Sequence, residues 1–324
     1  MTMFAAKLVG PKQFEFYEKQ APDIETAPPG SVVVRMRRAT ICGSDVPYYL
    51  GIHDVSQHQA LECFPAHECV GEVVASNSPD FKAGDTVLSQ PDFFTGLGQY
   101  FLARDWRTVH IPNDGNWRRW LMAQPLGTVI WGMRKVGAMF HQNVVVIGQG
   151  AMGLLSAQMC SCLGAKTVIV ADPHPNRLEI AAATGATHTL TNTGDSLIPA
   201  VKDILKGEEV DLVVEAVGHQ TETINTAIHL VRNGGTILAY GVPDVEVYPL
   251  SYNELFRKNC RLITTVVPDL PRDFALAVQY IKTGRVNVDR FVTHEFSFNE
   301  LHDAFELFHT RRDNVLKVML NYDA

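Results

Sequence analysis

The segment NVVVIGQGAMG, residues 143–153, decides the fold because its residue pattern changes in the middle. Its first half is a β-branched apolar run that ends at a glycine, which is typical of a strand buried on both faces. From Ala151 to Leu163 small and apolar residues follow without a charged residue, which favours a buried helix. A strand that passes through a glycine turn into a helix indicates a parallel sheet with helices on its faces.

The alternation of strands and helices continues from about Ala123 to about Pro268. Strands are expected at 143–148, 167–172, 211–218 and 235–241, and helices at 151–163, 177–184 and 221–231. Continuous apolar strands separated by helices predict a parallel sheet that is covered on both sides. We therefore assign residues 123–267 to an α/β domain with a doubly wound parallel sheet.

The residues before this domain have a different pattern. Up to residue 122 the chain carries short β-type runs between turn residues, with strands expected at 31–39, 70–76 and 84–89. This pattern predicts an antiparallel, β-rich domain. Residues 268–324 hold short elements that cannot form a core alone, namely helices at 273–283 and 299–310 and the strand-like runs HEFSF and VLKVMLN. We expect them to complete the first domain.

Length, charge and cysteine usage exclude several classes of protein. A chain of 324 residues fits two domains, and its net charge of −7 gives no attraction for nucleic acid or an anionic membrane. The stretch from Lys135 to Lys166 has no charge in between, but its glycine turn favours a buried strand and helix over a membrane span. Six cysteines without framework spacing, and no secretory leader, predict a reduced protein in the cytoplasm.

Three glycines where the expected strand 143–148 passes into the expected helix 151–163 form a G-x-G-x-x-G pattern. They are Gly148, Gly150 and Gly153. Asp172 closes the next strand nineteen residues after Gly153, which is the context of a dinucleotide-binding turn. The helix N-terminus at Ala151 offers backbone N–H groups to a pyrophosphate. Asp172 can accept hydrogen bonds from the ribose hydroxyls and would repel a 2′-phosphate, so the sequence predicts NAD rather than NADP.

A second group of chemically active residues lies in the β-rich part. Cys42 stands in ICGSD (41–45), and His67 and Glu68 stand in AHE (66–68). Thiolate, imidazole and carboxylate all bind zinc, and a catalytic zinc has three protein ligands and one open position. The motifs lie twenty-five positions apart, so their spacing alone indicates little. In isolation Cys42 would be interpreted as a buried thiol and His67 as a core histidine.

Together these motifs resemble the zinc-dependent medium-chain dehydrogenases, especially the polyol (sorbitol) and threonine dehydrogenase-like branch. CGSD, AHE, FKAGDTV (81–87), AQPLGT (123–128), GQGAMG (148–153) and GGTILAYGV (234–242) occur in the family's order over nearly the whole chain. The resemblance implies a Rossmann domain beside a GroES-like catalytic domain. It also implies hydride transfer between a secondary alcohol or polyol and NAD, in a homodimer or homotetramer.

The resemblance further implies roles for five residues. Cys42 and His67 match the zinc ligands, and Glu68 matches the carboxylate that either binds the metal directly or stands just behind it. Asp45 looks like the partner that orients His67, and Ser44 matches the hydroxyl that takes the proton of the alcohol. In this chemistry zinc polarises the alcohol oxygen, Ser44 relays the proton, and a hydride passes to the nicotinamide.

The resemblance also implies contacts to NAD. Thr128 and Met152 match positions that pack against the nicotinamide, and Val217 and Gly241 are among the expected cofactor-binding residues. Arg177 could meet a 2′-phosphate. With an aspartate at the end of the preceding strand, however, we interpret it as an adenine-side contact or a surface charge.

The chain departs from the family pattern at three places. Gln124 stands where polyol-type relatives carry Glu, and an amide is a poorer zinc ligand, so water or substrate is expected as fourth ligand with Gln124 nearby. Pro47 replaces a histidine that ends the proton relay in many relatives. Residues 85–98 lack the four cysteines of the structural zinc, so at most one zinc per subunit is expected. The edge strand 261–267 is expected to pair across a dimer.

Two other functions remain open at this point. One is a zinc-free reductase of the quinone oxidoreductase kind on the same fold, against which Cys42, His67 and Glu68 argue. The other is a protein that binds the dinucleotide without turnover, for which Gln124 and Pro47 would be signs of a decayed site. The identity of the substrate is not predicted.

Overall fold

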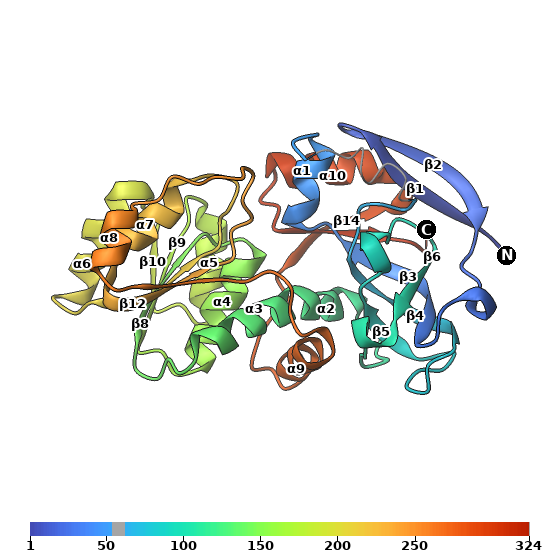
Figure 1. The fold of residues 1–324 in the computed structure, drawn as a ribbon, viewed down its shortest axis with the longest axis horizontal. Coiled ribbons are helices and arrows are strands. Elements are labelled where there is room, and N and C mark those ends of the chain that lie inside the picture. Colours follow the sequence, from blue (N-terminus) through green and yellow to red (C-terminus); the bar gives the residue numbers. More distant parts are fainter. Residues whose placement is uncertain (54–61, 324) are drawn as a thin grey trace. The chain divides into compact units, whose positions relative to one another are not determined.

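The computed structural model describes residues 1–53 and 62–323. The chain divides into two compact units. The first unit consists of Met1–Gln124, Asp269–Ile281 and Val288–Ala324, and the second of Pro125–Pro268 and Lys282–Asn287 (Figure 1). Among the described residues, no helix has the length and apolar character needed to cross a membrane.

A six-stranded parallel sheet forms the centre of the second unit. Its spatial order is β10–β9–β8–β11–β12–β13, and every neighbouring pair is parallel. The strands are β8 (Asn143–Ile147), β9 (Thr167–Ala171), β10 (His188–Leu190), β11 (Val210–Glu215), β12 (Val231–Ala239) and β13 (Arg261–Thr264). All side chains of β8 and β9 are buried, as expected from their apolar runs. The predicted doubly wound α/β fold is confirmed.

Helices alternate with these strands along the second unit. They are α3 (Ala123–Val136), α4 (Ala151–Cys162), α5 (Pro175–Ala183), α6 (Leu197–Leu205), α7 (Glu222–Leu230) and α8 (Tyr252–Arg257). The sequence analysis missed β10 and the helices α3, α6 and α8. Two of the three β10 side chains are exposed, so no apolar run marks the strand. The α6 segment contains Pro199, a helix-breaking signal, yet Leu197, Val201 and Leu205 on one face are buried.

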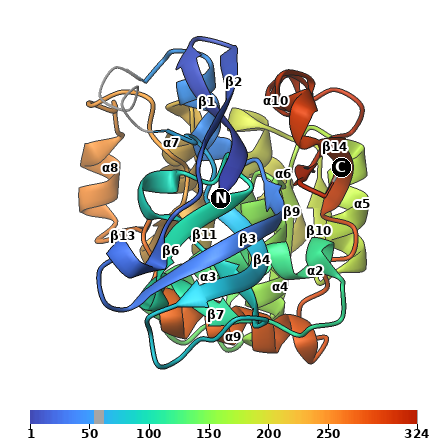
Figure 2. The ribbon, with the colours of Figure 1, turned by 90° about the vertical axis from the view of Figure 1, so that its right-hand side faces the viewer.

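The first unit is built around a mostly antiparallel β-structure; the predicted antiparallel pattern holds except for β14 and β15, which pair in parallel. Its larger sheet has the order β14–β15–β3–β4–β5–β7, with β6 also paired to β3, and β1 and β2 form a separate hairpin. Figure 2 shows β3 and β4 side by side. The strands are β1 (Thr2–Gly10), β2 (Gln13–Gln20), β3 (Ser31–Thr40), β4 (Glu68–Ser76), β5 (Thr86–Ser89), β6 (Tyr100–Arg104), β7 (Thr108–His110), β14 (Val292–Ser297) and β15 (Lys317–Asn321).

The helices of the first unit are short or close to the C-terminus. They are α1 (Val46–Tyr49), α2 (Trp117–Leu121), α9 (Leu270–Lys282) and α10 (Leu301–Thr310), with the single 3₁₀ turns η2 (Gly43–Asp45), η3 (Asp92–Phe94) and η6 (Phe298–Glu300) near them. Buried side chains from β1, β3, β4, β15 and α10 form one hydrophobic core. The last strand, β15, pairs antiparallel with β3, with Met319 opposite Thr40.

The edge strand β13 is shorter than the predicted strand 261–267. It ends at Thr264, and Val266 and Val267 lie beyond it with 66% and 67% of their surfaces exposed. In the strand Thr264 pairs with Ala239 of β12, and no described strand pairs with the other edge of β13.

Candidate functional site

The register of β3 against β4 brings the two ligand motifs together. Thr40, the last residue of β3, pairs with Glu68, the first residue of β4. Cys42 therefore follows one strand at the point where His67 and Glu68 begin the other. The ligand atoms of Cys42, His67 and Glu68 all lie within 4.8 Å of one another. Within residues 1–53 and 62–323, this is the one group of three or more His, Cys, Asp and Glu side chains with such geometry.

The turn after β3 supports Cys42 and reaches His67. The backbone N–H of Cys42 donates to Oδ2 of Asp45 at 2.9 Å. The other carboxylate oxygen, Oδ1, lies 3.3 Å from Nδ1 of His67. The hydroxyl of Ser44 donates to Sγ of Cys42 at 3.2 Å. The structure thus brings together the four residues for which catalytic roles are predicted.

His67 is buried in an environment that favours positive charge. Burial by itself lowers the pKa of the imidazole, but the negative charges of Asp45 and Cys42 outweigh this, so that the pKa of His67 is raised well above its usual value. The ring of Phe94 packs on the imidazole, with 4.7 Å between the centroids. Either a proton or a metal ion can satisfy this demand for positive charge, and the two compete for the same ring.

Glu68 has a charged partner that the sequence analysis missed. The ammonium of Lys317 donates to Oε1 and Oε2 of Glu68 at 2.7 and 2.5 Å, and to the carbonyl of Ile41 at 3.1 Å. The hydroxyl of Thr40 donates to the same carboxylate. Glu68 and Lys317 are 1% and 3% exposed. Burial lowers the pKa of Lys317, but the charges of Glu68 and Cys42 outweigh it and raise the pKa.

The signal for Lys317 was present in the sequence. It is the one charged residue in the apolar closing run VLKVMLN. A lysine on a strand that lies next to β3 must have its charge neutralised if it is buried. What could not be read from the run is the residue opposite it, because β15 and β4 are more than two hundred positions apart in sequence.

The donor set fits zinc. A thiolate, an imidazole and a carboxylate are ligands that zinc accepts, and the three ligand atoms lie within 4.8 Å of one another. Cys42, Asp45 and Glu68 can supply three negative charges against the single positive charge of Lys317, so a divalent cation would bring the group closer to neutrality.

The residues that depart from the family pattern lie in three elements of the structure. Gln124 is buried in the first turn of α3. Pro47 is buried in α1, which follows the turn that contains Cys42. Where relatives carry the four cysteines, this chain has η3, whose Phe93 and Phe94 adopt left-handed φ values of 53° and 60°. Such backbone conformations are costly for bulky residues and tend to occur at functional sites.

The glycine turn of the second unit has the geometry that a dinucleotide requires. Gly148 has a φ of 88°, and a Cβ there would lie 2.6 Å from Val217. A Cβ on Gly153 would lie 1.7 Å from the carbonyl oxygen of Gly148, so α4 can pack on this turn only with glycine. By contrast, a Cβ on Gly150 would meet nothing within 4 Å, and no side chain caps α4. The helix N-terminus therefore faces open space that suits an anion.

Asp172 lies directly after β9, but little of it is accessible. It is 4% exposed. Its carboxylate accepts hydrogen bonds from the backbone N–H of Gln149 and from both the backbone N–H and the ring Nδ1 of His174. Arg177 lies 3.6 Å from it and is 8% exposed. The interpretation of Arg177 as a surface charge is therefore wrong.

A cavity of about 610 Å³ lies in the second unit at the carboxyl ends of β11, β12 and β13. Its lining includes Gly241, one of the predicted cofactor-binding residues, and Glu215. The carboxylate of Glu215 accepts hydrogen bonds from the backbone N–H groups of Val217 and Gly218 and so holds the loop after β11. In parallel sheets ligands bind at this end of the strands. Thr128 in α3 and the helix-initial pair Ala151 and Met152 in α4 are each half-buried.

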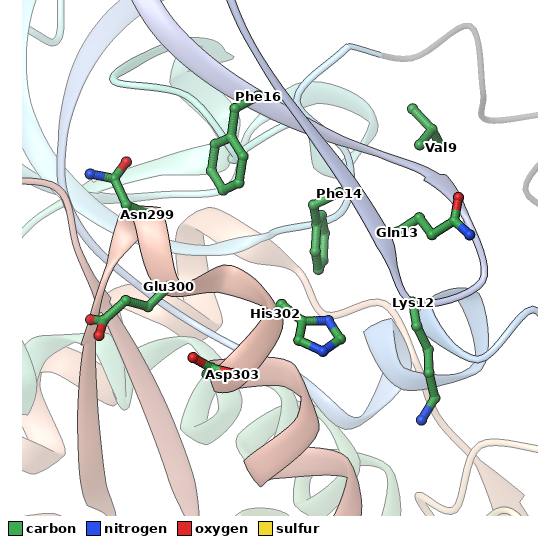
Figure 3. Close-up of a pocket in the computed structure, with 9 residues that line it drawn as sticks. All are labelled: Val9, Lys12, Gln13, Phe14, Phe16, Asn299, Glu300, His302 and Asp303. Carbon is green, nitrogen blue, oxygen red and sulfur yellow. The ribbon is translucent and has the colours of Figure 1, made fainter.

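A second cavity, of about 550 Å³, lies in the first unit between the β1–β2 hairpin and α10 (Figure 3). Phe14 of the hairpin points toward the helix residue His302, and Phe16 lies on the side of Asn299. The charged residues of its lining are Lys12, Glu300 and Asp303. Lys12 binds Glu306 at 2.7 Å, and the same carboxylate accepts a hydrogen bond from the buried Tyr49. These contacts hold the hairpin on the helix and do not form a catalytic group.

Comparison with known families and proteins agrees with this arrangement. The family model described as the Alcohol dehydrogenase GroES-like domain matches residues 28–146, and the model described as Zinc-binding dehydrogenase matches residues 151–283. The two models together cover most of the chain, in the order in which the two units follow one another.

Individual relatives match over nearly their full length. The sorbitol dehydrogenase of Bacillus subtilis (strain 168) is 25% identical, over 98% of this chain and 97% of the relative. The sorbitol dehydrogenase of Gallus gallus is 28% identical, over 91% of this chain and 90% of the relative. Among solved structures, alcohol dehydrogenase TADH from Thermus sp. ATN1 superposes with a TM-score of 0.85 at 25% identity, over 99% of this chain and 100% of that chain.

Replacing Cys42 by serine is expected to abolish zinc binding. Wild-type protein purified without chelators should hold about one zinc per subunit by elemental analysis, because three ligands converge at one place. Cys42→Ser should hold little, since a hydroxyl is a much weaker ligand than a thiolate. Cys162→Ser, which changes an exposed thiol of the second unit, should retain the metal. Wild-type protein that stays free of zinc after reconstitution would contradict the site.

Removing Lys317 is expected to destabilise the metal-free protein strongly. Lys317→Met leaves the buried carboxylate of Glu68 without its counter-charge, which costs about 3–5 kcal/mol in comparable pairs. The free energy of unfolding, measured in urea, should fall by that amount. In the double variant Lys317→Met/Glu68→Gln the loss should be much smaller, because no charge is left unpaired.

The control for this experiment is the exposed pair Lys166–Glu208. Lys166→Met should barely change the unfolding midpoint, since exposed ion pairs contribute little. If the effects of Lys317→Met and Glu68→Gln simply add, the two side chains are not energetically coupled and the interpretation of the pair is wrong.

Proposed function

The chain belongs to the zinc-dependent medium-chain dehydrogenase family of alcohol and polyol oxidoreductases, and we propose that it uses one zinc ion and NAD to oxidise a secondary alcohol or polyol, or to reduce the matching ketone. The convergence of Cys42, His67 and Glu68 carries this proposal. Among residues 1–53 and 62–323 no fourth Cys, His, Asp or Glu joins this group, so three protein ligands would leave a position for the substrate oxygen.

The chain's own residues would divide the work as follows. Cys42, His67 and Glu68 hold the metal, which when bound supplies Lewis-acid polarisation of the substrate oxygen. The carboxylate of Asp45 faces Nδ1 of His67 and so orients the ring. Nε2 of His67 would then be available to the ion. Ser44, whose hydroxyl touches Sγ of Cys42, stands beside the ligands and is the group that takes the proton of the alcohol.

The residues around Cys42, His67 and Glu68 determine the charge and polarity at these ligands. Lys317 and Thr40 hold Glu68 from the side of β3 and β15, and they reduce its charge toward the metal. Phe94 packs against the ring of His67 and would offer an apolar surface to the carbon chain of a substrate. Gln124 would lie near the open position as a neutral hydrogen-bonding group.

The second unit would bind NAD. The backbone at Gly150 and the first turn of α4, including the N–H groups of Ala151 and Met152, would hold the pyrophosphate. Gly241, which lines the cavity, together with Val217 and Thr128 would hold the nicotinamide half. Asp172 and Arg177 lie at the adenosine end of this path.

The two alternative functions differ from this proposal in measurable ways. A zinc-free reductase of the quinone oxidoreductase kind has no use for Cys42, His67 and Glu68, whereas here they converge. A protein that only binds the dinucleotide would need no hydroxyl beside the ligands, whereas Ser44 is there. Both alternatives predict no zinc-dependent oxidation of any alcohol.

Replacing Ser44 by alanine is expected to lower kcat by about a hundredfold, since a positioned proton acceptor contributes at least that much. A panel of secondary alcohols and polyols is assayed with NAD and zinc-loaded enzyme, and the best substrate is used. Ser44→Thr, which keeps the hydroxyl, should retain most of the activity. Zinc content and NADH affinity should not change. Full activity in Ser44→Ala would exclude Ser44 from proton transfer, and no turnover of any alcohol would favour the alternatives.

We also propose that two copies associate through the edge strand β13. The apolar residues near this edge are strongly exposed, among them Val266, Val267 and Phe256. An unpaired strand edge with exposed apolar side chains favours pairing with a second copy. The cysteines of the described chain are all free thiols, which suits a reducing compartment, and we place the protein in the cytoplasm.

Charges introduced at this edge are expected to separate the copies. Sedimentation equilibrium should give at least twice the subunit mass of 35.9 kDa for the wild type and a smaller mass for Val266→Lys/Val267→Lys. Phe140→Lys changes another highly exposed apolar residue of the second unit and serves as the control. An unchanged mass in the double variant would show that this edge is not the interface.

A further inference from the structure

The cavity between the β1–β2 hairpin and α10 has two aromatic side chains in its lining, Phe14 and Phe16 (Figure 3). Other rings hold both of them in place. Phe14 stacks on Tyr49 with 5.8 Å between the ring centroids and 20° between the planes. Phe16 stacks on Phe4 at 5.6 Å and 8°, and Phe298 packs edge-on against it. Phe16 is nevertheless 38% exposed, so part of its surface is accessible to a ligand.

The part of the lining that comes from the start of α10 is acidic. Glu300 is the N-cap residue of α10, and Asp303 lies in its first turn. Both residues line the cavity. Glu300 accepts a hydrogen bond from the backbone N–H of Ser297 at 2.8 Å, and this contact brings no positive charge. Among the residues that the structure describes, neither carboxylate forms an ion pair, so no cation of the chain offsets their negative charges.

The positive charge in the lining is already matched by another residue. Lys12 is the one lysine or arginine that lines the cavity. Its ammonium lies 2.7 Å from Oε1 of Glu306, a carboxylate of the next turn of α10. Because this pair offsets the charge of Lys12, the two unpaired carboxylates at the start of α10 give the cavity a negative potential. Such a cavity attracts cations.

The geometry favours an organic cation over a metal ion. A metal needs several ligand atoms that converge, and within residues 1–53 and 62–323 the one such group is that of Cys42, His67 and Glu68. None of these three residues lines this cavity. The volume of about 550 Å³ falls within the range of sites for small organic molecules. Aromatic faces attract alkylammonium ions, whereas the two carboxylates would repel a phosphate or carboxylate ligand.

We propose that this cavity is a binding site for a small organic ammonium ion. The charged nitrogen lies over the ring of Phe16 and near the carboxylates of Glu300 and Asp303, and the alkyl substituents pack on Phe14. The rings are fixed by their neighbours, so binding does not have to order them. This inference does not rest on the proposed function, because it involves neither the zinc ligands nor the dinucleotide site.

The test measures binding of butyltrimethylammonium to the full-length, zinc-loaded protein by calorimetry. This probe has no hydroxyl group and so is not an alcohol substrate. A dissociation constant of about 1 mM is expected, because cation–π contacts and exposed charge pairs are each weak. N-butylacetamide has the same alkyl chain without the charge and should bind at least about tenfold more weakly. Equal affinity for the two probes would show that the cavity does not recognise a cation.

Two variants test the aromatic and the acidic part separately. Phe16→Leu keeps an apolar side chain without the ring, and it should lower the affinity for butyltrimethylammonium about fivefold. Asp303→Asn keeps the shape without the charge, and it should lower the affinity about threefold. Thermal denaturation checks that both variants are folded.

Matched changes in the second unit serve as controls. Phe140→Leu removes another exposed ring, and Glu222→Gln removes a carboxylate from the first turn of another helix, α7. Both should leave the affinity unchanged. Loss of affinity in Phe16→Leu and Asp303→Asn alone supports the site. Unchanged affinity in these two variants, or no binding of the probe at about 20 mM, overturns it, and either result leaves the zinc content and the oxidation of alcohols as separate questions.

Discussion

The buried ion pair between Glu68 and Lys317 is the constraint on which the rest of the first unit depends. Glu68 begins β4, Lys317 begins β15, and both strands pair with β3. Their side chains meet beside the end of β3, where Thr40 joins the same carboxylate. Because an unpaired buried charge is so unfavourable, this contact favours the one register in which Cys42 and His67 also come together.

In the second unit, buried carboxylates also hold segments of the chain in place. Buried carboxylates follow two of its parallel strands, Asp172 after β9 and Glu215 at the end of β11. Each accepts backbone N–H groups of a loop, that of Gln149 in one case and those of Val217 and Gly218 in the other. The loops that face the proposed cofactor are therefore held by hydrogen bonds to charged groups, which are stronger than those to neutral ones.

Most regular elements of the fold could be predicted from local patterns, and the exceptions have local reasons. The buried run Asn143–Ile147 reads as a strand because parallel strands are apolar on both faces. The strand β10 has mostly exposed side chains and carries no such run. The predicted strand 261–267 was too long by three residues, because β-branched residues continue after the pairing with β12 ends at Thr264.

The sequence by itself determined the chemistry of the candidate site, namely the residue types in CGSD, AHE and the glycine turn, since ligand and backbone requirements are properties of single residues. Only the tertiary structure decided which groups surround them. Two contacts show this: Lys317 binds Glu68, and Phe94 packs on His67. The residues of each pair lie far apart in the sequence, and no local sequence pattern connects them. His174 lies two positions from Asp172, yet only its ring orientation shows that it covers the carboxylate. Burial and hydrogen-bond geometry arise from packing between elements, and no local pattern encodes them.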